Sequence, residues 1–500
     1  MELSRSYGVA PRAPRKPAMS RTASETTRQR ASRDIVMQVL VRIGNLAIGA
    51  LVTALVVRTL GATGYGEWST TFIALTLVAY LGNFGTQGVA LREAAKDPEH
   101  EHEWIGAVMF LRMVMVVPMM IVAIGAIVLL HRSEQMLIAG IILILTMPFD
   151  GVGALGLLFQ LRVDNRVPML VLTIRSVLWG IAVVIIHADH GTMVALAVAM
   201  AVTNAVGSLL QGIAVLKLDV RLPRPSRKRL GTVLRVGLPI GVAGALIISY
   251  ARIDQLIVYV IAGSKSAGLY GAVYNLLDQA HFVPVSVLTT LAPVMAASWP
   301  RDRTRLLRTS RLTAELLAIM SLGGMAFAIV AAEPVVRLLF GEEFVPAAPA
   351  LPVLAAAFVF ISFDYLNGNL LVVLGQQHRL LRVSLIALIV NLAGNLILVP
   401  LIGFMGAAWM TLVTEIVVFG GSLSLILREL DIGLPGPGRM LRTLLAAIIL
   451  GAGLELLRLA DVSLAVLIAA TVAGYPALLF GLRAVNADDV RTVIARGALS

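Results

Sequence analysis

The stretch Leu464 to Phe480 reads LAVLIAATVAGYPALLF and holds no charged residue. Leu444 to Leu454 is uncharged as well, and similar apolar tracts recur along the chain between short charged breaks. A helix needs about 20 apolar residues to cross the hydrocarbon core of a bilayer, and these tracts approach that length. With 58% hydrophobic and 14% charged residues among 500, the chain is too apolar for water-soluble domains. The sequence therefore predicts an all-α polytopic membrane protein with about 14 transmembrane helices.

Charge divides the chain into segments. The first 33 residues carry eight Lys or Arg among Pro, Ser and Thr, a composition that favours a disordered tail over a packed domain or a cleaved signal peptide. The loop from Lys217 to Arg235 carries seven basic residues and follows six predicted spans. The predicted segments are a basic tail (1–33), a six-helix lobe (34–217), a basic linker (218–235), a second six-helix lobe (236–430), an additional helix pair (431–485) and a tail (486–500).

The Lys and Arg residues gather on one side of the predicted spans. With the amino terminus in the cytoplasm, the basic residues that fall on the opposite side are Arg58, Arg132, Lys265, Arg337 and Arg458. Basic residues are enriched in cytoplasmic loops of membrane proteins. The sequence therefore predicts a multi-pass protein of the inner (cytoplasmic) membrane with both termini in the cytoplasm.

Several kinds of chemistry have no sequence support. The chain has no cysteine, which excludes disulfides, thiolate metal sites and a cysteine nucleophile. We find no Walker-type phosphate loop, no G-x-S-x-G elbow and no H-E-x-x-H helix. The His-rich stretches at 187–190 and 99–103 are more typical of solvated loops than of metal sites. Catalysis therefore has no visible seat in the sequence, and we expect no enzyme activity, no metal, no cofactor and no nucleic-acid partner.

A short internal repeat supports the division into two lobes. At an offset of 202 residues, Gly61-Ala62-Thr63-Gly64-Tyr65-Gly66-Glu67-Trp68 aligns with Gly263-Ser264-Lys265-Ser266-Ala267-Gly268-Leu269-Tyr270. Both stretches have Gly, four residues, Gly, one residue and an aromatic. Both are predicted at the turn between the first and second spans of their lobe. Because six spans is an even number, the lobes share one orientation, and a substrate path is expected between them.

Polar residues follow helical spacing in three predicted spans, 35–57, 68–90 and 267–297. The three sets are Gln38, Arg42, Asn45, Gly49 and Thr53; Thr76, Tyr80, Asn83 and Gln87; and Tyr270, Tyr274, Asp278 and His281. Steps of three or four residues place each set on one helical face. Polar groups in a span cost a few kcal/mol each, so such faces indicate a water-filled cavity. Interhelical hydrogen bonds between the spans are the alternative.

Charged residues inside spans need partners. Arg252 and Asp254 are two residues apart and point to nearly opposite sides of a helix, so they cannot neutralise each other. Each requires a partner on another helix, a cavity or a substrate charge. Asp278 has no Lys or Arg in its own predicted span, and Asp364 shares a face with Asn367. For these acids, the alternative to a functional role is a permanently paired or neutral carboxyl. For an arginine inside a span, the alternative is a side chain that snorkels to the headgroups.

Five loose blocks, in this order and spacing, resemble one family. They are Arg58-Thr59-Leu60-Gly61 through Gly64-Tyr65-Gly66; Ala90-Leu91-Arg92-Glu93-Ala94; Asp254 with Gly268-Leu269-Tyr270-Gly271-Ala272-Val273-Tyr274; Glu333-Pro334 through Leu339-Phe340-Gly341-Glu342-Glu343-Phe344; and Leu374-Gly375-Gln376 with Asn391, Asn395, Pro400 and Gly403-Phe404-Met405-Gly406-Ala407-Ala408. The chain resembles the oligosaccharide flippase (polysaccharide-export) branch of the multidrug/oligosaccharidyl-lipid/polysaccharide transporter superfamily. The resemblance covers about residues 34–430.

The resemblance implies two six-helix lobes forming a V around a central cavity, with the first, second, seventh and eighth helices lining its lateral openings. It also implies alternating access and a polyprenyl-diphosphate-linked oligosaccharide as cargo, for cell-surface polysaccharide or lipopolysaccharide biosynthesis. Membrane lipid and polysaccharide assembly proteins would be the partners. Guanidinium forks match diphosphate oxygens, and aromatic faces suit sugar rings. The expected substrate-binding residues are Arg42, Asn45, Arg175, Arg252, Tyr80, Asn83, Gln87, Tyr270 and Tyr274, and the expected ion-coupling residues are Asp278, Asp254 and Asp364.

Three other functions compete with this interpretation. A cation-coupled multidrug exporter of the same superfamily would use the acids to bind Na⁺ or H⁺, but arginines inside the membrane argue against cationic cargo. A flippase for the peptidoglycan lipid precursor would use the same headgroup chemistry. A membrane glycan polymerase or ligase is disfavoured, because such enzymes present sizeable external loops and the predicted external loops are short.

Overall fold

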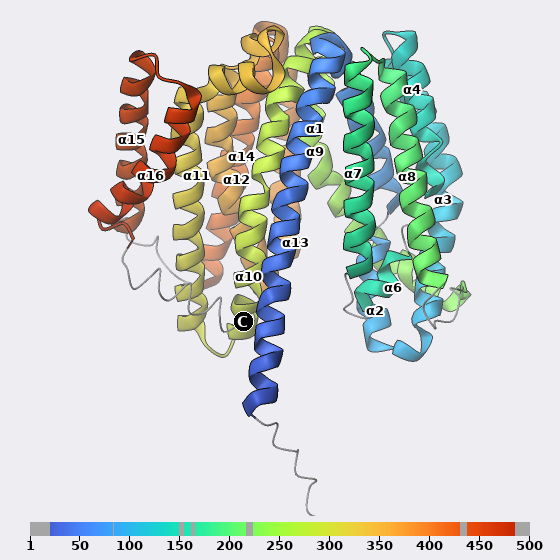
Figure 1. The fold of residues 1–500 in the computed structure, drawn as a ribbon. Coiled ribbons are helices and arrows are strands. Elements are labelled where there is room, and N and C mark those ends of the chain that lie inside the picture. The colour runs from blue at the N-terminus through green and yellow to red at the C-terminus, as the bar shows by residue number, and fades with distance from the viewer. Residues whose placement is uncertain are drawn as a thin grey trace, which may run out of the picture. The chain divides into compact units, whose positions relative to one another are not determined.

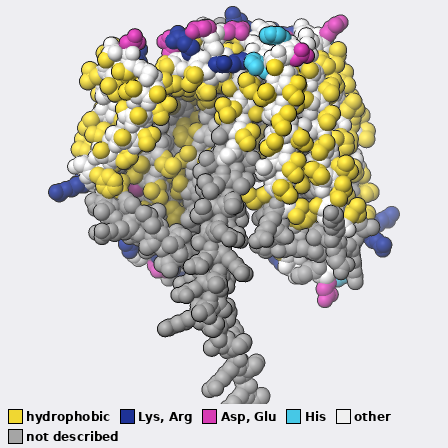
Figure 2. Space-filling view, in the orientation of Figure 1, with side chains coloured by type: hydrophobic (Ala, Val, Ile, Leu, Met, Phe, Trp, Pro, Cys, Tyr) yellow, Lys and Arg dark blue, Asp and Glu magenta, His cyan; other side chains and the backbone are white. Residues whose placement is uncertain are grey.

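A computed structural model describes residues 21–83, 85–149, 155–161, 166–216, 224–430 and 438–485. Ala47–Asn486 form one compact unit, and the residues before Ala47 belong to a second, smaller unit. The described residues form helices and no strand, which confirms the all-α fold class. Eleven of these helices are long and apolar enough to cross a membrane. Figure 2 shows hydrophobic side chains covering the flank of the molecule, with charged side chains gathered toward its two ends.

The amino-terminal half comprises the first helices of the chain. They are α1 (Arg21–Asn83), α2 (Thr86–Lys96), η1 (Pro98–His100), α3 (Glu101–Leu130), α4 (Glu134–Ile144), α6 (Gly156–Leu161), α7 (Arg166–Ala188) and α8 (Met193–Leu216). In lipid a helix satisfies its own backbone hydrogen bonds, so apolar tracts of this length fold as helices. Around α4, the apolar helix Glu134–Phe149 is shorter than the eleven candidate spans.

The carboxyl-terminal half and the final helix pair complete the bundle (Figure 1). They are α9 (Arg227–Ala280), α10 (Phe282–Ser298), α11 (Arg303–Phe340), η2 (Glu342–Ala347), α12 (Ala350–Val373), α13 (Gln377–Ile402), α14 (Phe404–Leu430), α15 (Gly438–Leu459) and α16 (Leu464–Gly481). The pair α15 and α16 packs on α11, where the Tyr475 ring lies against Gly323. The predicted count of 14 spans is not confirmed, and the two-lobe boundaries stay a prediction.

The two repeat motifs are the points where α1 and α9 break. Gly61 has φ 64° and ψ 179°, and Gly263 has φ 92° and ψ 170°, so the backbone leaves helical geometry at both. A positive φ is readily adopted by glycine and strained for other residues. Each helix therefore has two arms, before and after its glycine, as predicted for a turn between two spans. We call the end of the bundle that carries these breaks the glycine end.

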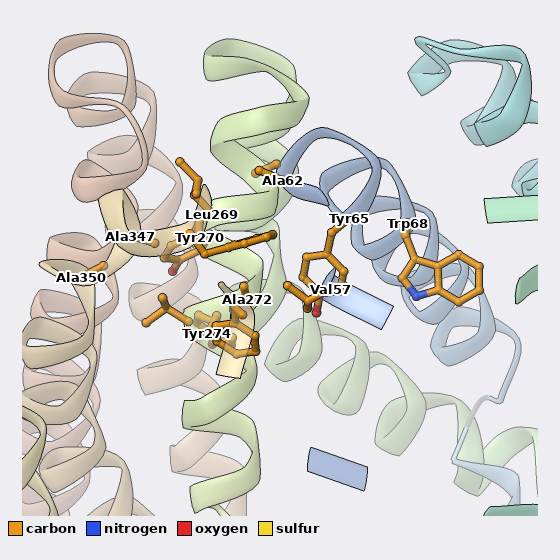
Figure 3. Packing of buried hydrophobic residues seen from close by; sticks show 14 of the residues in the cluster. Val57, Ala62, Tyr65, Trp68, Leu269, Tyr270, Ala272, Tyr274, Ala347 and Ala350 are labelled. Atoms are coloured by element: carbon orange, nitrogen blue, oxygen red, sulfur yellow. The ribbon is translucent and has the colours of Figure 1, made fainter. Parts of the chain in front are cut away.

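The two motifs pack against each other in a reciprocal way. A Cβ built on Gly66 would lie 1.8 Å from the Ser264 carbonyl oxygen, and a Cβ built on Gly268 would lie 1.7 Å from the Ala62 carbonyl oxygen. Ser264 and Ala62 are themselves equivalent positions of the repeat. No side chain fits in either place, so backbone meets backbone across the halves. Figure 3 shows the surrounding core, with Ala62 and Tyr65 of α1 near Leu269 and Tyr270 of α9.

Two arginines reinforce the same contact between the halves. Arg58 of α1 donates from Nε to the Leu339 carbonyl at 2.9 Å, and Arg132, just after α3, donates from Nη2 to the Val260 carbonyl at 3.1 Å. Val260 is the repeat equivalent of Arg58. The first arm of α1 thus contacts the end of α11, and in the same way the first arm of α9 contacts the end of α3. Glu343 adds an acceptor for the Ala62 N–H, 3.0 Å from Oε1.

The structure corrects several sequence-based boundaries. The span predicted at 68–90 is not one helix, because α1 ends at Asn83 and α2 begins at Thr86 after Gly85, whose φ is 60°. The span predicted at 267–297 is interrupted at His281, between α9 and α10. The helix α1 already begins at Arg21, within the tail predicted to be disordered. The residues 21–33 include Ala, Glu and Arg, which extend a helix readily.

The basic linker also differs from the prediction in its second part. Residues 217–223 lie outside the described residues, and α9 starts at Arg227, so the rest of the linker is largely helical. Val233 is buried in a cluster with residues of α2 and α3. Arg229 binds Asp97 at 2.6 Å, and its guanidinium lies 4.6 Å from the Trp104 ring centre. The start of α9 is therefore part of the amino-terminal core.

Candidate functional site

A cavity of about 320 Å³ lies between α1 and α9, next to the motif contact. Both arms of each broken helix line it, with Trp179 of α7 and Met200 of α8 on one side. Its size falls within the usual range of ligand pockets, about 300–1,000 Å³. The prediction is a cavity between the halves, with the spans that α1 and α9 contain at its lateral openings. The polar groups Thr53, Thr76, Tyr274 and Asp278 lie in its wall, as their spacing indicated.

Aromatic rings form much of the wall. The Trp68 and Phe72 rings lie 4.9 Å apart, and Tyr65, Trp179 and Tyr274 complete the set. Sequence analysis did not assign Trp68, Phe72 or Trp179 to a site. For the first two a signal existed, because Phe72 and Trp68 continue the Thr76 face backward in steps of four. Aromatic side chains combined with polar groups are typical of ligand-binding pockets.

Arg252 and Asp278 form an ion pair in this wall. Arg252 donates from Nη1 to Asp278 Oδ2 at 2.8 Å and from Nη2 to Oδ1 at 3.0 Å. The Tyr274 ring centre lies 5.4 Å from the guanidinium carbon. Both side chains remain partly accessible, with 28% of Arg252 and 24% of Asp278 exposed. The partner that Arg252 required is therefore a carboxylate from the other arm of its own helix.

Further polar contacts fix the wall. Gln255, three residues after Arg252, donates from Nε2 to Ser69 Oγ at 2.9 Å and so joins α9 to α1. The Tyr274 hydroxyl donates to the Ala251 carbonyl at 3.0 Å and joins the two arms of α9. Sequence analysis did not identify Gln255 or Ser69, although Gln255 shares a helical face with Arg252. These bonds hold the Arg252 side of the cavity in place.

Asp254 lies away from the cavity in the interior of the carboxyl-terminal half. It is 2% exposed and accepts from the Tyr270 hydroxyl at 2.5 Å, the Gln255 N–H at 2.8 Å and the Thr411 hydroxyl at 3.2 Å. These three donors are neutral groups. Tyr270 is fully buried with it, so it does not line the cavity. Asp254 is therefore held by hydrogen bonds, whereas Arg252 faces the cavity two residues earlier.

Asp364 belongs to a second polar group, between α12 and α14. Its Oδ1 accepts from the Ser422 hydroxyl at 3.0 Å, and Asn367 donates to the same hydroxyl at 2.9 Å. The helical face that Asp364 and Asn367 share therefore makes hydrogen bonds between α12 and α14. Among the residues that the structure describes, no group of three or more His, Cys, Asp or Glu could hold a metal ion.

The remaining predicted site residues are not brought together. The side chains of Arg42, Asn45 and Asn83 lie outside the described part of the structure. Arg175 is exposed on α7, where its stem packs near Gly207 of α8, and it does not line this cavity. Tyr80 is 41% exposed. Gln87, on the separate helix α2, accepts from Arg112 at 3.3 Å.

Comparisons with known proteins agree with this architecture. A family model described as "Polysaccharide biosynthesis protein" matches residues 31–299. An uncharacterized membrane protein of Methanocaldococcus jannaschii is 26% identical over 191 residues, which are 37% of this chain and 36% of that protein. The chain thus spans about a third of the length of this relative.

Solved structures share the fold. The lipid II flippase MurJ in an inward closed conformation has a TM-score of 0.72 at 13% identity, with 90% of this chain and 99% of that chain covered. An inward-facing multidrug resistance transporter of the MATE family has a TM-score of 0.66 at 18% identity, with 77% and 95% covered. A MOP superfamily transporter from Pyrococcus furiosus has a TM-score of 0.57 at 19% identity, with 80% of this chain and 97% of that chain covered. That structure is described by the reverse polarity of its binding pocket.

Proposed function

The chain belongs to the polysaccharide biosynthesis protein family, and on that premise we propose that it is a flippase for lipid-linked oligosaccharides. Its cargo would be a polyprenyl-diphosphate-linked oligosaccharide, moved across the cytoplasmic membrane by alternating access. The lipid tails would stay in the bilayer while the headgroup crosses through the cavity. Polysaccharide assembly proteins would supply the substrate or use the product.

The observation that carries the proposal is the Arg252 guanidinium in an aromatic cavity. The guanidinium, paired with Asp278, lines a space that Trp68, Phe72 and Tyr274 also line. A guanidinium binds phosphate oxygens with two parallel hydrogen bonds, and aromatic faces suit sugar rings. The combination matches the two parts of the proposed headgroup.

The glycine end would face the outside of the cell. Lys and Arg are concentrated at the opposite end, and basic residues are enriched on the cytoplasmic side of membrane proteins, which supports a cytoplasmic location for that end and for both termini. The Gly66 and Gly268 contact then closes the outer side of the cavity, which corresponds to an inward state. Transport would separate this contact and open the cavity outward.

A source of energy is needed if transport runs uphill. No nucleotide motif is visible in the sequence, so an ion gradient or removal of product outside would drive the cycle. The candidate coupling carboxyls are Asp278, Asp254 and Asp364. Asp278 is first among them because it lies in the cavity wall, while Asp254 is buried in the carboxyl-terminal half and Asp364 binds Ser422 between α12 and α14.

The peptidoglycan lipid precursor is the second candidate cargo. It presents the same diphosphate, and the fold similarity to a lipid II flippase covers nearly all of that protein. A cationic drug fits less well. Arg252 and Asp278 are the charged residues among the described lining residues, and they neutralise each other, so this wall offers a cation no net negative charge.

Flipping can be measured directly in liposomes that contain a fluorescent polyprenyl-diphosphate oligosaccharide. Arg252→Ala should abolish flipping, and Arg252→Lys should restore part of it, because lysine keeps the charge and loses the fork. The matched control is Arg308→Ala, at an exposed position near the start of α11. Normal flipping by Arg252→Ala would refute the headgroup assignment. Transport of an organic cation in place of either lipid would identify a drug exporter instead.

A further inference from the structure

The Arg252 fork is already occupied in this structure. Asp278 fills it with two hydrogen bonds, the same pattern that a phosphate group would make. A headgroup that binds Arg252 must therefore replace a carboxylate rather than enter an empty site. This inference rests on the proposed function, since it concerns how the same site takes its headgroup.

The pair is placed so that exchange is possible. Both side chains are about one quarter exposed and line the cavity, so the released carboxylate would pass into the water of the cavity. The oxygens of the incoming ligand take over both hydrogen bonds of Arg252, which offsets the loss of the bidentate pair. Asp254 is the contrast within the same helix, because it is enclosed and held by three donors.

Opening the pair would leave α9 intact. Its two arms stay joined by the Tyr274 hydroxyl on the Ala251 carbonyl and by the Tyr270 hydroxyl on Asp254. The exchange breaks two N–H···O bonds from Arg252 to Asp278 and forms two from Arg252 to phosphate oxygens. It therefore changes the charge distribution in the cavity without separating the helices.

We propose that Asp278 is a selectivity residue that occupies Arg252 in place of the substrate until an anionic lipid diphosphate displaces it. The surrounding bilayer offers anionic phospholipids in large excess, and each carries a phosphate that an open guanidinium would bind. An internal competitor lowers the affinity for every anion by the same factor. The affinity for a phospholipid with one negative charge then becomes too low for that lipid to occupy the site. The affinity for a diphosphate with two charges remains high enough.

The first test measures binding to the purified full-length chain with two probes, farnesyl diphosphate and short-chain phosphatidylglycerol. Asp278→Asn should bind both at least about tenfold more tightly than the wild type, because the competitor is gone. Arg252→Ala should lose both. Glu134→Gln, an exposed acid at the glycine end, is the matched control and should bind as the wild type does.

The second test measures flipping in two kinds of vesicle. Phosphatidylglycerol in place of phosphatidylcholine should inhibit Asp278→Asn and leave the wild type unaffected. Infrared difference spectra provide a test on the unmutated chain, where farnesyl diphosphate should shift a carboxylate band as Asp278 leaves the guanidinium.

The outcomes separate the two proposals. Unchanged or weaker binding by Asp278→Asn, with loss of binding by Arg252→Ala, overturns the exchange and keeps the headgroup site. Absence of a carboxylate band at saturation also overturns the exchange, even if Asp278→Asn fails to fold. Wild-type binding by Arg252→Ala overturns both the exchange and the proposed headgroup site.

Discussion

Gly66 and Gly268 meet without a side chain between them, and each presses on the backbone of the other's motif. A methyl group at either position would overlap a carbonyl oxygen of the opposite half, 1.8 Å away for Gly66 and 1.7 Å away for Gly268. Backbone cannot move aside as the end of a flexible side chain can. Closure of the glycine end therefore requires glycine at both positions, because even the methyl group of alanine would not fit.

Gly66→Ala should prevent closure of the glycine end and reduce flipping at least about tenfold. The chain has no cysteine, so Thr53→Cys in the cavity wall can report access without background labelling. We expect a membrane-impermeant maleimide added from outside to label that cysteine faster in Gly66→Ala. Gly125→Ala is the control, because a Cβ there meets nothing within 4 Å. Equal labelling in both backgrounds would show that the contact does not control access.

Arg132→Ala should weaken the same closure by a smaller amount. Arg132 donates to the Val260 carbonyl and lies 5.0 Å from the Tyr259 ring centre, so its loss removes a hydrogen bond and a cation–π contact. These are worth about 1 kcal/mol, or roughly fivefold in the open-to-closed ratio. The labelling assay should show this increase, and Lys265→Ala, at an exposed position on the same end, should not. A change equal to that of Lys265→Ala would contradict the role of Arg132.

The pH dependence of the opposite end can be predicted from Asp97. Hydrogen bonding to His100, followed by the charges of His100 and Arg229, holds the pKa of Asp97 below its ordinary value of 3.8. A carboxyl whose pKa is lowered in the folded state stabilises that state at pH values above its unfolded-state pKa. This stabilisation is lost as the pH falls through the folded-state pKa. Thermal stability should therefore keep this contribution at neutral pH and lose it below about pH 4.

Asp97→Asn should remove that part of the acid dependence, and melting temperatures measured from pH 7 to pH 3 would test it. Glu99→Gln is the control, because Glu99 is an exposed acid two residues further along the same loop. If both variants follow the wild-type curve below pH 4, the contacts among Asp97, His100 and Arg229 do not stabilise the fold.

Tyr270→Phe should destabilise the carboxyl-terminal half. The tyrosine hydroxyl bonds both Asp254 and Thr411 in a buried place, and its loss leaves the carboxyl short of one donor. We expect a loss of about 1–3 kcal/mol, seen as a lower melting temperature in detergent. Tyr80→Phe, on an exposed tyrosine, should leave the melting temperature unchanged. Equal melting temperatures for the two variants would show that the Asp254 contacts are energetically neutral.

Helical periodicity predicted the fold class and part of the cavity wall. The repeat predicted the breaks at Gly61 and Gly263, because both motifs combine turn residues with the same topological position. The positions of Thr53, Thr76, Tyr274 and Asp278 in the wall could be predicted, because each belongs to a set of polar residues spaced three or four apart on a single helix.

Other features depend on contacts that no single helix contains. Arg252 and Asp278 lie on different arms of α9, so only the bend at Gly263 brings them together. The break at Gly85 was not predicted, because one glycine in an apolar stretch is compatible with a continuous helix. Asp254 and Asp364 are acids inside predicted spans, as Asp278 is, but their hydrogen bonds to α14, from Thr411 and Ser422, cannot be read from their own helices.

The reciprocal contact at the glycine end has the pattern found on the axis of a symmetric dimer. There, position i of one subunit touches position j of the other, and j touches i. Gly66 on Ser264 and Gly268 on Ala62 repeat this pattern within one polypeptide. The protein therefore has, within one chain, the contact that a two-fold axis would generate between two subunits. The two motifs differ at most positions, and both have a glycine where the backbones touch.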